Sequence, residues 1–515
     1  MKRYDATVVG AGPNGLAAAI HLARAGLSVR LVEAAAEVGG GLRSAELTLP
    51  DFVHDVCASV LPLGFASPFL DGLPLAEHGL RWVQPELCLA HALDGGEAVV
   101  LARDLAATAA GLGVDGRAYR RLVGPHVDAK AALIDTFLGP LKLPTSPRTA
   151  LAAGRFGVPA LTSARLLATT SFRGERARAL FAGLAAHAIQ PLERPATAAF
   201  ALMLALLAHE PDLAHEPDVA YEGIAHAPVP RGGWPFVAGG TGRLAAAMAA
   251  YFASLGGEIE TSRRVTDLGE LSDSRYVLLD LAPRDVLRVM GQRLGRHDRS
   301  SIRYRRGLER YRHGPGVFKL DLALSGPVPW TAEACRQAGT VHLGGTLEEV
   351  AAAERLVWQG VHPERPFVLV AQPSLFDRSR VPVGGAERAH TLWAYCHVPN
   401  GSDIDLTAQV FDQLERFAPG VRDLVLATHA RTAAAYEVYD PNFVGGDINC
   451  GVQDLGQLFT RPAARLDPYS TPDERTFVCS SATPPGGGVH GLCGVGAARS
   501  LLRRLDLGPR AEVRA

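Results

Sequence analysis

The sequence predicts an α/β protein in which a Rossmann-like domain is assembled from segments that lie far apart in the chain. Three observations predict this fold: a strand, glycine turn, helix and strand at the N-terminus; a helix followed by strands near the middle; and a strand, glycine-rich passage and helix near the C-terminus. The length of 515 residues exceeds what one hydrophobic core usually fills. We therefore expect a second, α+β domain interleaved with the first.

The composition excludes several classes of function. The 52 Lys and Arg residues nearly balance the 53 Asp and Glu residues, so no global positive field favours nucleic acid as a partner. The seven cysteines include no C-x-x-C pair, which argues against a redox disulfide or a zinc knuckle and favours reduced thiols in a cytoplasmic protein. They are Cys57, Cys88, Cys335, Cys396, Cys450, Cys479 and Cys493.

The longest strongly apolar run, residues 196–208, is too short to span a bilayer, which takes roughly 20 residues. We expect it to form a buried helix, with an interfacial helix as the alternative. The arginine-rich stretch 293–312 predicts a solvated face, and peripheral contact with an anionic membrane is the alternative. Oligomeric state stays open.

The N-terminal motif carries the strongest functional signal. Residues 6–9 form a β-rich strand, residues 16–25 a helical stretch and residues 29–32 a second strand. The turn between the first strand and the helix combines glycines that permit a tight bend, close approach of a pyrophosphate and close helix–strand packing. Free N–H groups at the helix start then face the anion. The predicted cofactor contacts in this turn are Gly10, Gly12, Pro13, Asn14 and Gly15.

Glu33 follows directly on the second strand. A carboxylate at this position accepts hydrogen bonds from both ribose hydroxyls of a dinucleotide and repels a 2′-phosphate. Strand, turn, helix and acid together predict a dinucleotide site, whereas a glycine turn alone would be weak evidence.

The next segment, Gly39-Gly-Gly-Leu-Arg43-Ser44, resembles the second glycine motif of the FAD domain in the amine oxidase and phytoene desaturase superfamily. The resemblance implies FAD as the cofactor, with Gly40 and Arg43 in contact with it. A flexible glycine turn is the alternative.

Two later segments resemble the rest of such an FAD domain. The helix that opens at residues 238–244, with strands at 258–261 and 276–281, is similar to the second segment, and this similarity implies that the backbone at Val265 pairs with adenine. The strand 477–481 and the passage 484–491 lead into the last helix, and N–H groups in such a passage can face the negative charge of a reduced flavin. The contacts expected here are Ser481, Gly488, Val489 and His490.

Together with residues 440–447 and 457–462, these motifs closely resemble the phytoene desaturase-like NAD(P)/FAD-dependent oxidoreductases, in the subgroup that carries a pyridine nucleotide-disulfide oxidoreductase domain. The resemblance covers nearly the whole chain. Because the sequence has no redox cysteine pair, we do not expect disulfide reduction.

Two residues are candidates for catalysis. Lys319 lies in a strand, with Trp330 downstream, that resembles the amine oxidase segment in which a lysine reaches a water near flavin N5. Burial there would lower the pKa of the lysine, and a lysine at the polar edge of the strand is the alternative. His490 could touch the flavin or substrate, or could be a hydrogen-bonded structural histidine.

Other positions have weaker signals. Ser59, with Asp55, is expected to wall the isoalloxazine, and packing or loop capping is the alternative. His187 and Gln190 could line the substrate cavity, although a satisfied core histidine is the more common case. Phe200, Met203 and Leu207 fall at helical spacing and are expected in the core, with a cavity wall as the alternative.

A repeated His-Glu-Pro-Asp sequence at residues 209–212 and 215–218, with His226 nearby, could suggest a metal site. Because loops broken by proline rarely preorganise metal ligands, no metal site is predicted.

These segments predict an FAD-binding domain from residues 1–65, 225–285 and 465–515 and a substrate domain from residues 66–224 and 286–464. A mostly apolar insert suits an apolar substrate at the domain interface. The leading hypothesis is hydride transfer between a polyene or isoprenoid-like molecule and flavin N5, in desaturation, isomerisation or saturation. The alternatives are a flavin amine oxidase acting on a C–N bond and a non-catalytic, FAD-stabilised interaction protein.

Overall fold

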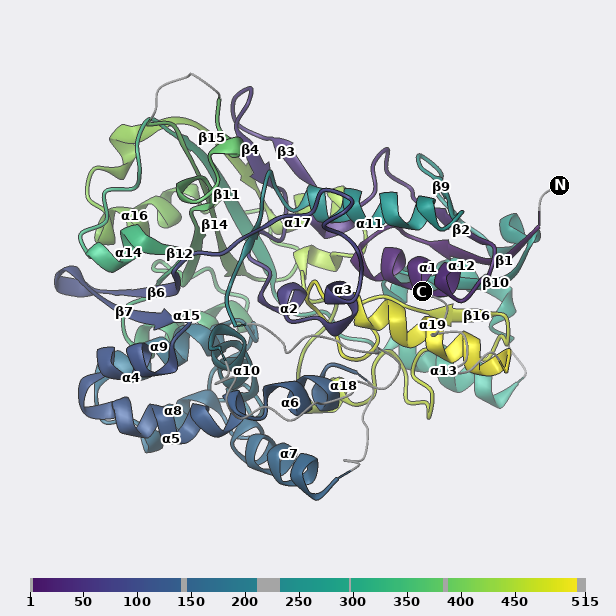
Figure 1. Ribbon diagram of the computed structural model, residues 1–515, viewed down its shortest axis with the longest axis horizontal. Helices are drawn as coiled ribbons and strands as arrows, with labels where there is room; N and C mark the ends of the chain where they lie inside the picture. The colour runs from purple at the N-terminus through teal and green to yellow at the C-terminus, as the bar shows by residue number, and fades with distance from the viewer. Residues whose placement is uncertain (1–2, 140–145, 211–231, 296–297, 383–387, 507–515) are drawn as a thin grey trace.

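Two β-sheets organise the molecule, and they lie toward opposite ends of it (Figure 1). The computed structural model describes residues 3–139, 146–210, 232–295, 298–382 and 388–506. Helices cover both sheets, and the chain passes between the two regions several times.

The first sheet is parallel and has the strand order β16-β10-β1-β2-β9. Its strands come from three distant stretches of sequence, which confirms the predicted Rossmann-like α/β fold; the predicted domain limits themselves stay a prediction. The strands are β16 (Thr476–Val478), β10 (Ser274–Leu279), β1 (Tyr4–Val9), β2 (Val29–Val32) and β9 (Glu258–Glu260).

Helix α1 (Pro13–Arg24) begins at Pro13, earlier than the predicted start at Leu16. Proline is well suited to the first helical turn, because its fixed φ matches the helix and its missing N–H needs no partner. Pro13 and Asn14, predicted in the turn, therefore belong to the first turn of the helix.

Two helices from the distant segments pack on α1: α19 (Leu492–Arg504) and α11 (Gly242–Ser254). The contact with α19 is so close that a Cβ on Gly494 would lie 1.9 Å from the carbonyl oxygen of Asn14. At the other end of the sheet, Arg30 pairs with Asp273 at 2.8 Å and so ties β2 to the loop before β10. The first and last segments are thus fixed to each other by backbone contact.

The second sheet has seven strands in the order β15-β11-β14-β13-β12-β6-β7. Most neighbours are antiparallel, and β12 and β6 are parallel. The strands are β15 (Val425–Arg431), β11 (Gly316–Leu324), β14 (His390–Val398), β13 (Val368–Ala371), β12 (Ala338–Leu343), β6 (Leu87–Leu93) and β7 (Glu97–Ala102).

The two faces of this sheet differ in character. One face is apolar, and its core includes Phe318, Leu320 and Val410, the last from α16 (Thr407–Phe417). Because side chains alternate along a strand, Lys319 and Asp321 of β11 fall on the opposite face. That face therefore presents polar side chains toward the rest of the molecule.

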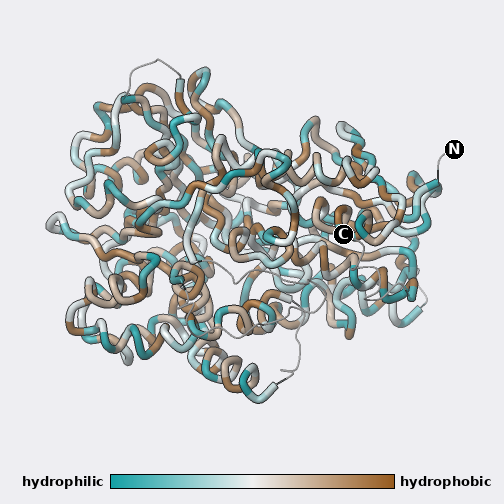
Figure 2. The backbone as a smooth tube through the Cα atoms, viewed as in Figure 1, coloured by the Kyte–Doolittle hydropathy of each residue, from teal (hydrophilic) through white to brown (hydrophobic). Residues whose placement is uncertain are grey.

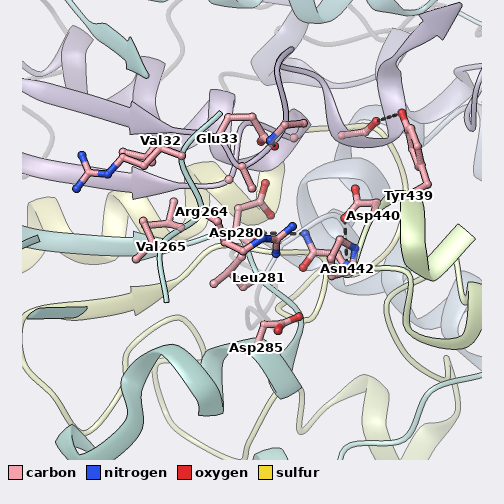
Figure 3. Close-up of a pocket in the computed structure, with 18 of the residues that line it drawn as sticks. Val32, Glu33, Arg264, Val265, Asp280, Leu281, Asp285, Tyr439, Asp440 and Asn442 are labelled. Carbon is pink, nitrogen blue, oxygen red and sulfur yellow. Dashed lines mark hydrogen bonds between the residues drawn. The ribbon is translucent and has the colours of Figure 1, made fainter. Parts of the chain in front are cut away.

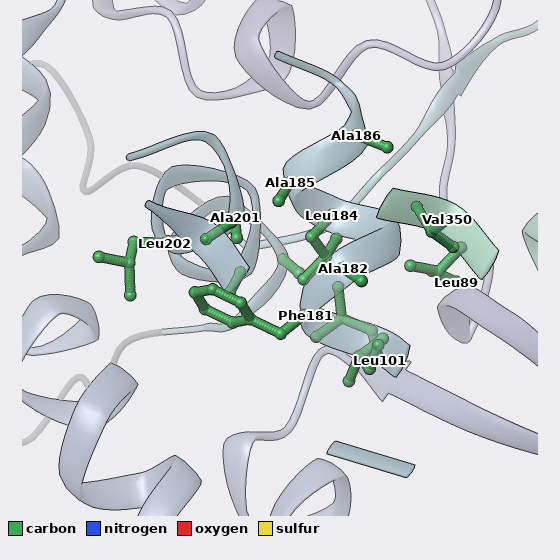
Figure 4. Close-up of a cluster of buried hydrophobic side chains, with 14 of the residues drawn as sticks. Leu89, Leu101, Phe181, Ala182, Leu184, Ala185, Ala186, Ala201, Leu202 and Val350 are labelled. Atoms are coloured by element: carbon green, nitrogen blue, oxygen red, sulfur yellow. The ribbon is translucent and has the colours of Figure 1, made fainter. Parts of the chain in front are cut away.

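A layer of helices packs below the second sheet (Figure 1), and hydrophobic stretches run through it (Figure 2). Helix α10 is buried there against α9, as predicted for the apolar run, and Figure 4 shows Ala201 and Leu202 of α10 in one cluster with Phe181 and Leu184 of α9. Across the described ranges no helix combines the length and apolar character that a bilayer span requires. The helices of this layer are α4 (Leu105–Gly111), α5 (Gly116–Val127), α6 (Lys130–Phe137), α7 (Pro147–Ala160), α8 (Ala164–Ser171), α9 (Glu175–Ala186), α10 (Ala198–Ala208) and α15 (Leu347–Trp358).

A buried ion pair joins the two regions. The Arg380 guanidinium is fully buried and donates to the Asp55 carboxylate at 2.7 Å and to the Val237 carbonyl at 2.9 Å. Asp55 also accepts hydrogen bonds from the Thr241 backbone N–H and the Ser59 hydroxyl, each at 2.7 Å. A charge-assisted network of this kind fixes the region of the second sheet against two segments of the Rossmann-like region.

Candidate cofactor site

A cavity of about 280 Å³ lies at the carboxyl ends of β1, β2 and β10. Ligands of open α/β sheets bind at this edge. Figure 3 shows Glu33, Val265 and Asp280 around the cavity, with Asp440 and Asn442 closing it from the side of α17 (Ala433–Tyr439). Predicted residues that line it are Gly10, Gly12, Glu33, Gly40, Arg43 and Val265.

The glycine turn is packed too tightly for side chains. Gly10 has φ +99°, and a Cβ there would lie 2.9 Å from the Asp280 carbonyl oxygen. A Cβ on Gly15 would lie 1.9 Å from the Gly10 carbonyl oxygen. The turn therefore presents bare backbone at the start of α1, as an anion site at a helix N-terminus requires.

Glu33 organises the turn from the end of β2. Its carboxylate accepts hydrogen bonds from the backbone N–H of Ala11 at 2.7 Å and of Ala35 at 2.8 Å. A carboxylate has about four acceptor positions, so capacity remains for ribose hydroxyls. Glu33 is thus both a structural acceptor and a cavity-lining acid.

Arg43 reaches the same cavity. Its guanidinium lies 3.3 Å from Glu33 and donates to the Glu37 carbonyl at 2.7 Å. It also lies 5.6 Å from the centre of the Tyr439 ring. This position sets a positive charge beside the glycine turn.

The C-terminal passage meets the start of α1. The Asn14 amide donates to the Ser481 hydroxyl at 3.1 Å, and the Asn14 Oδ1 has no hydrogen-bond partner. Gly488 has φ +124° and lies against Leu63, so that a Cβ there would be 2.6 Å from the Leu63 Cδ1. Val489 is half-buried next to it. The structure therefore brings Ser481 to Asn14 and Gly488 to Leu63, two separate contacts of the C-terminal passage with the N-terminal segment.

His490 is hydrogen-bonded inside the C-terminal passage, and its expected catalytic and flavin contacts stay a prediction. The ring is buried, its Nδ1 accepts from the Leu492 N–H at 3.0 Å, and its Nε2 lies 3.2 Å from the Gly486 carbonyl. Burial lowers the pKa of His490 to about 4. Both ring nitrogens are thus used inside the passage, which favours the structural alternative.

The contacts of Ser59 favour the alternative of packing or loop capping. Its hydroxyl is buried and donates to Asp55, so it belongs to the ion-pair network with Arg380, and its expected contact with a cofactor stays a prediction. The sequence neighbourhood alone could not show this, because Arg380 is remote in the chain.

Lys319 is buried, so the alternative of an exposed strand edge is wrong. Its ammonium lies 2.6 Å from Asp321 Oδ1 and 2.7 Å from the Asp55 carbonyl oxygen. Burial lowers the pKa of Lys319, while Asp321 opposes this effect. Because these oxygens already engage the ammonium, the proposed role in holding a reactive water is not supported by the contacts.

Sequence reasoning missed Asp280 and Asn442, which line the cavity. Asp280 accepts the Gly15 N–H at 2.9 Å. Asn442 donates to the Asp280 carbonyl at 3.2 Å and accepts from the Ala282 N–H at 2.8 Å. The segment 440–447 had been noted only for its resemblance; its contacts with the end of β10 depend on tertiary structure.

Neutral histidines line the polar face of the second sheet. His187 lies 3.2 Å from His342, nitrogen to nitrogen, and the His91 Nε2–H donates to the Gly345 carbonyl at 2.7 Å. Burial lowers the pKa of His91 to about 4 and that of His187 to about 3, and holds the pKa of His342 well below its usual value. The predicted core histidine at 187 thus belongs to a larger buried group.

This group predicts a loss of stability in acid. Below about pH 6.5 these histidines become protonated in the unfolded chain but stay neutral in the folded protein. The free energy of unfolding therefore falls as pH drops toward 4. Each histidine contributes up to about 1.4 kcal/mol per pH unit in that window. We expect His342→Phe to flatten the slope by about one such contribution in urea unfolding at several pH values. An unchanged slope would count against a neutral buried His342.

Phe200 and Met203 are half-buried and Leu207 is buried, so the predicted helix face is partly core and partly open. Gln190 is buried without a hydrogen-bond partner for its amide.

In the described part of the chain no group of three or more His, Cys, Asp or Glu side chains is arranged as a metal site. Residues 211–212 of the first His-Glu-Pro-Asp sequence, the whole of the second and His226 lie outside the described residues.

All seven cysteines are free and buried. Burial raises the pKa of Cys57, Cys88 and Cys335 to about 12, which keeps these thiols protonated and unreactive. We expect a thiol-specific chromogenic reagent to label less than one cysteine in the native protein and all seven after denaturation. Rapid native labelling of a pair would instead indicate a redox role.

Comparisons with known proteins agree with this geometry. The model of the NAD(P)-binding Rossmann-like domain family matches residues 8–71. The pyridine nucleotide-disulfide oxidoreductase domain-containing protein 2 of Mus musculus is 26% identical, and the match covers 98% of this chain and 94% of that protein. Hydroxyneurosporene desaturase of Cereibacter sphaeroides is 36% identical over 35% of this chain and 38% of its own length.

Among solved structures, wild-type putrescine oxidase bound to putrescine superposes with a TM-score of 0.59 at 17% identity, covering 98% of this chain and 99% of that one. Fold, site and homologues together define the class as an oxidoreductase with a Rossmann-like dinucleotide-binding domain. More particularly, the chain is a homologue of the pyridine nucleotide-disulfide oxidoreductase domain-containing protein 2 and of hydroxyneurosporene desaturase, which confirms the predicted resemblance.

Proposed function

We propose that the protein is an FAD-dependent oxidoreductase that moves a hydride between an apolar, polyene or isoprenoid-like substrate and the flavin. The observation that carries the proposal is the convergence of three remote segments, residues 9–43, 263–288 and 439–442, on one glycine-lined cavity at the start of α1. The C-terminal passage meets the same helix through the contact between Asn14 and Ser481. FAD, when bound, supplies the hydride acceptor or donor at its N5 atom.

The residues of the cavity suit an adenine dinucleotide. Gly12 offers a backbone N–H group, Glu33 offers acceptors for ribose hydroxyls, and Arg43 offers positive charge to a phosphate. Val265 is buried and lines the same cavity, where its backbone can meet the adenine. The unpartnered Asn14 Oδ1, buried at the turn, is a further polar atom for the bound cofactor.

Apolar side chains beside the glycine-rich passage support an apolar substrate. Leu63, which touches Gly488, packs with Met203 and Leu204 against the buried Leu207. These three side chains are only half-buried, so they leave apolar surface next to the passage. Such a surface favours a hydrocarbon over a charged amine.

The contacts of Lys319 weaken the amine oxidase alternative. The Lys319 ammonium is committed to Asp321 and to the Asp55 carbonyl, so this chain provides no free lysine at that strand for amine oxidation by the expected route. The fold itself hosts both chemistries, as putrescine oxidase and hydroxyneurosporene desaturase illustrate.

Anaerobic reduction of the bound flavin tests the proposal. Phytoene and limonene serve as apolar substrates and putrescine as the amine, each mixed with the purified holoprotein under argon. We expect the visible flavin absorbance to bleach with an apolar substrate and to stay unchanged with putrescine. Bleaching by putrescine alone would favour an amine oxidase, and an oxidised flavin with every donor would favour the non-catalytic alternative.

A further inference from the structure

The carboxyl group of Asp280 occupies the position at the start of α1 where an anion is expected. It lies at the end of β10 and accepts the Gly15 N–H at 2.9 Å. A Cβ on Gly12 would lie 3.0 Å from the Asp280 Oδ2, and one on Gly10 would lie 3.1 Å from its Cβ. The acid is thus packed into the glycine turn, and its side chain is nearly fully buried.

The charges around Asp280 make a bound anion difficult beside an ionised carboxyl. Glu33 from β2 and Asp440 after α17 face it as further carboxylates. Arg43 is the cation beside the turn, and it is already 3.3 Å from Glu33. Pyrophosphate would add negative charge to this set in a partly desolvated site, where like charges repel strongly.

The thiols near Asp280 stay protonated at moderate pH. They are Cys450, Cys479 and Cys493, and burial raises the pKa of each, to about 11 for Cys493. At the outer rim of the cavity, Asp285 is paired with Arg288 at 2.8 Å, and Arg264 lines the same wall. Burial, together with Asp440 and Glu33, raises the pKa of Asp280 to about 8.

We propose that Asp280 is a cofactor-binding residue that acts in its neutral form, so that FAD binding requires a protonated carboxyl and takes up a proton whenever Asp280 is ionised beforehand. The carbonyl oxygen of the neutral carboxyl still accepts the Gly15 N–H, and its O–H can donate to a phosphate oxygen. The inference rests on the proposed FAD site, but it assigns Asp280 a role that FAD binding alone does not require.

The test is the dissociation constant of FAD, measured by flavin fluorescence on the deflavinated protein between pH 6.5 and 9.5. For the native chain we expect constant affinity below about pH 7.5 and about tenfold weaker binding per pH unit above 8. In Asp280→Asn the side chain keeps the same shape and carries an N–H donor at every pH. The affinity of this variant for FAD should therefore not change with pH. Asp440→Asn removes a neighbouring carboxylate and should move the onset to lower pH.

Proton uptake provides a measurement that needs no variant. Calorimetric titration of FAD at pH 8.5, in two buffers with different ionisation enthalpies, should show uptake of more than half a proton by the native chain. Equal heats in the two buffers, or a pH dependence that persists in Asp280→Asn, would overturn the inference. If FAD fails to bind at every pH, the proposed function itself fails, which is a distinguishable result.

Discussion

Arg380→Met is expected to lower the free energy of unfolding by about 3–5 kcal/mol. The substitution leaves Asp55 buried without its cation. Removal of one partner from a buried ion pair is far more costly than replacement of both partners by well-packed apolar side chains. It also deprives the Val237 carbonyl of a donor. Urea unfolding followed by far-ultraviolet circular dichroism measures the change.

The matched control is Arg422→Met. Arg422 pairs with Asp412 at 2.6 Å, but both side chains are largely in solvent. Pairs of this kind contribute about 1 kcal/mol or less, so the control should unfold close to the native chain. Equal losses in the two variants would contradict the view that the Asp55–Arg380 pair joins the two regions.

Gly15→Ala is expected to yield a protein that purifies without flavin. The new Cβ would lie 1.9 Å from the Gly10 carbonyl oxygen, so the turn must open and its N–H groups must move. A displacement of this size should weaken FAD binding by roughly 100-fold or more, which corresponds to about 2.7 kcal/mol. The readout is the ratio of flavin to folded protein after gel filtration, followed by titration with FAD.

Gly154→Ala is the control for the glycine substitution. Gly154 lies within α7, and nothing is found within 4 Å of a Cβ placed there. Alanine is the better helix former, so this variant should retain flavin and gain up to about 1 kcal/mol of stability. Retention of flavin by Gly15→Ala at the native level would show that the turn does not approach the cofactor.

The parts of this molecule that could be predicted from sequence are those in which local chemistry decides the structure. The glycines at 10, 12 and 15, the apolar strands and Glu33 each carry a local requirement. Gly10, Gly12 and Glu33 line the cavity, and Gly15 packs against the Gly10 carbonyl. The buried helix at 198–208 follows from its uninterrupted apolar sequence in the same way.

The remaining residues depend on partners that no local pattern indicates. Ser59 and His490 were expected at the cofactor, yet each is committed to a structural hydrogen bond. Lys319 was expected beside a reactive water, and its acidic partner Asp321 lies on the same strand face, a spacing that could have suggested the ion pair. Asp280 left no signal, because its position in the turn depends on the pairing of β10 with β1.

The flavin content of the purified native chain tests the central claim most directly. The account predicts a yellow protein, or a colourless one that regains a bound flavin spectrum on addition of FAD, at close to one FAD per chain. A correctly folded protein that stays colourless and leaves the fluorescence of added FAD unchanged would contradict it.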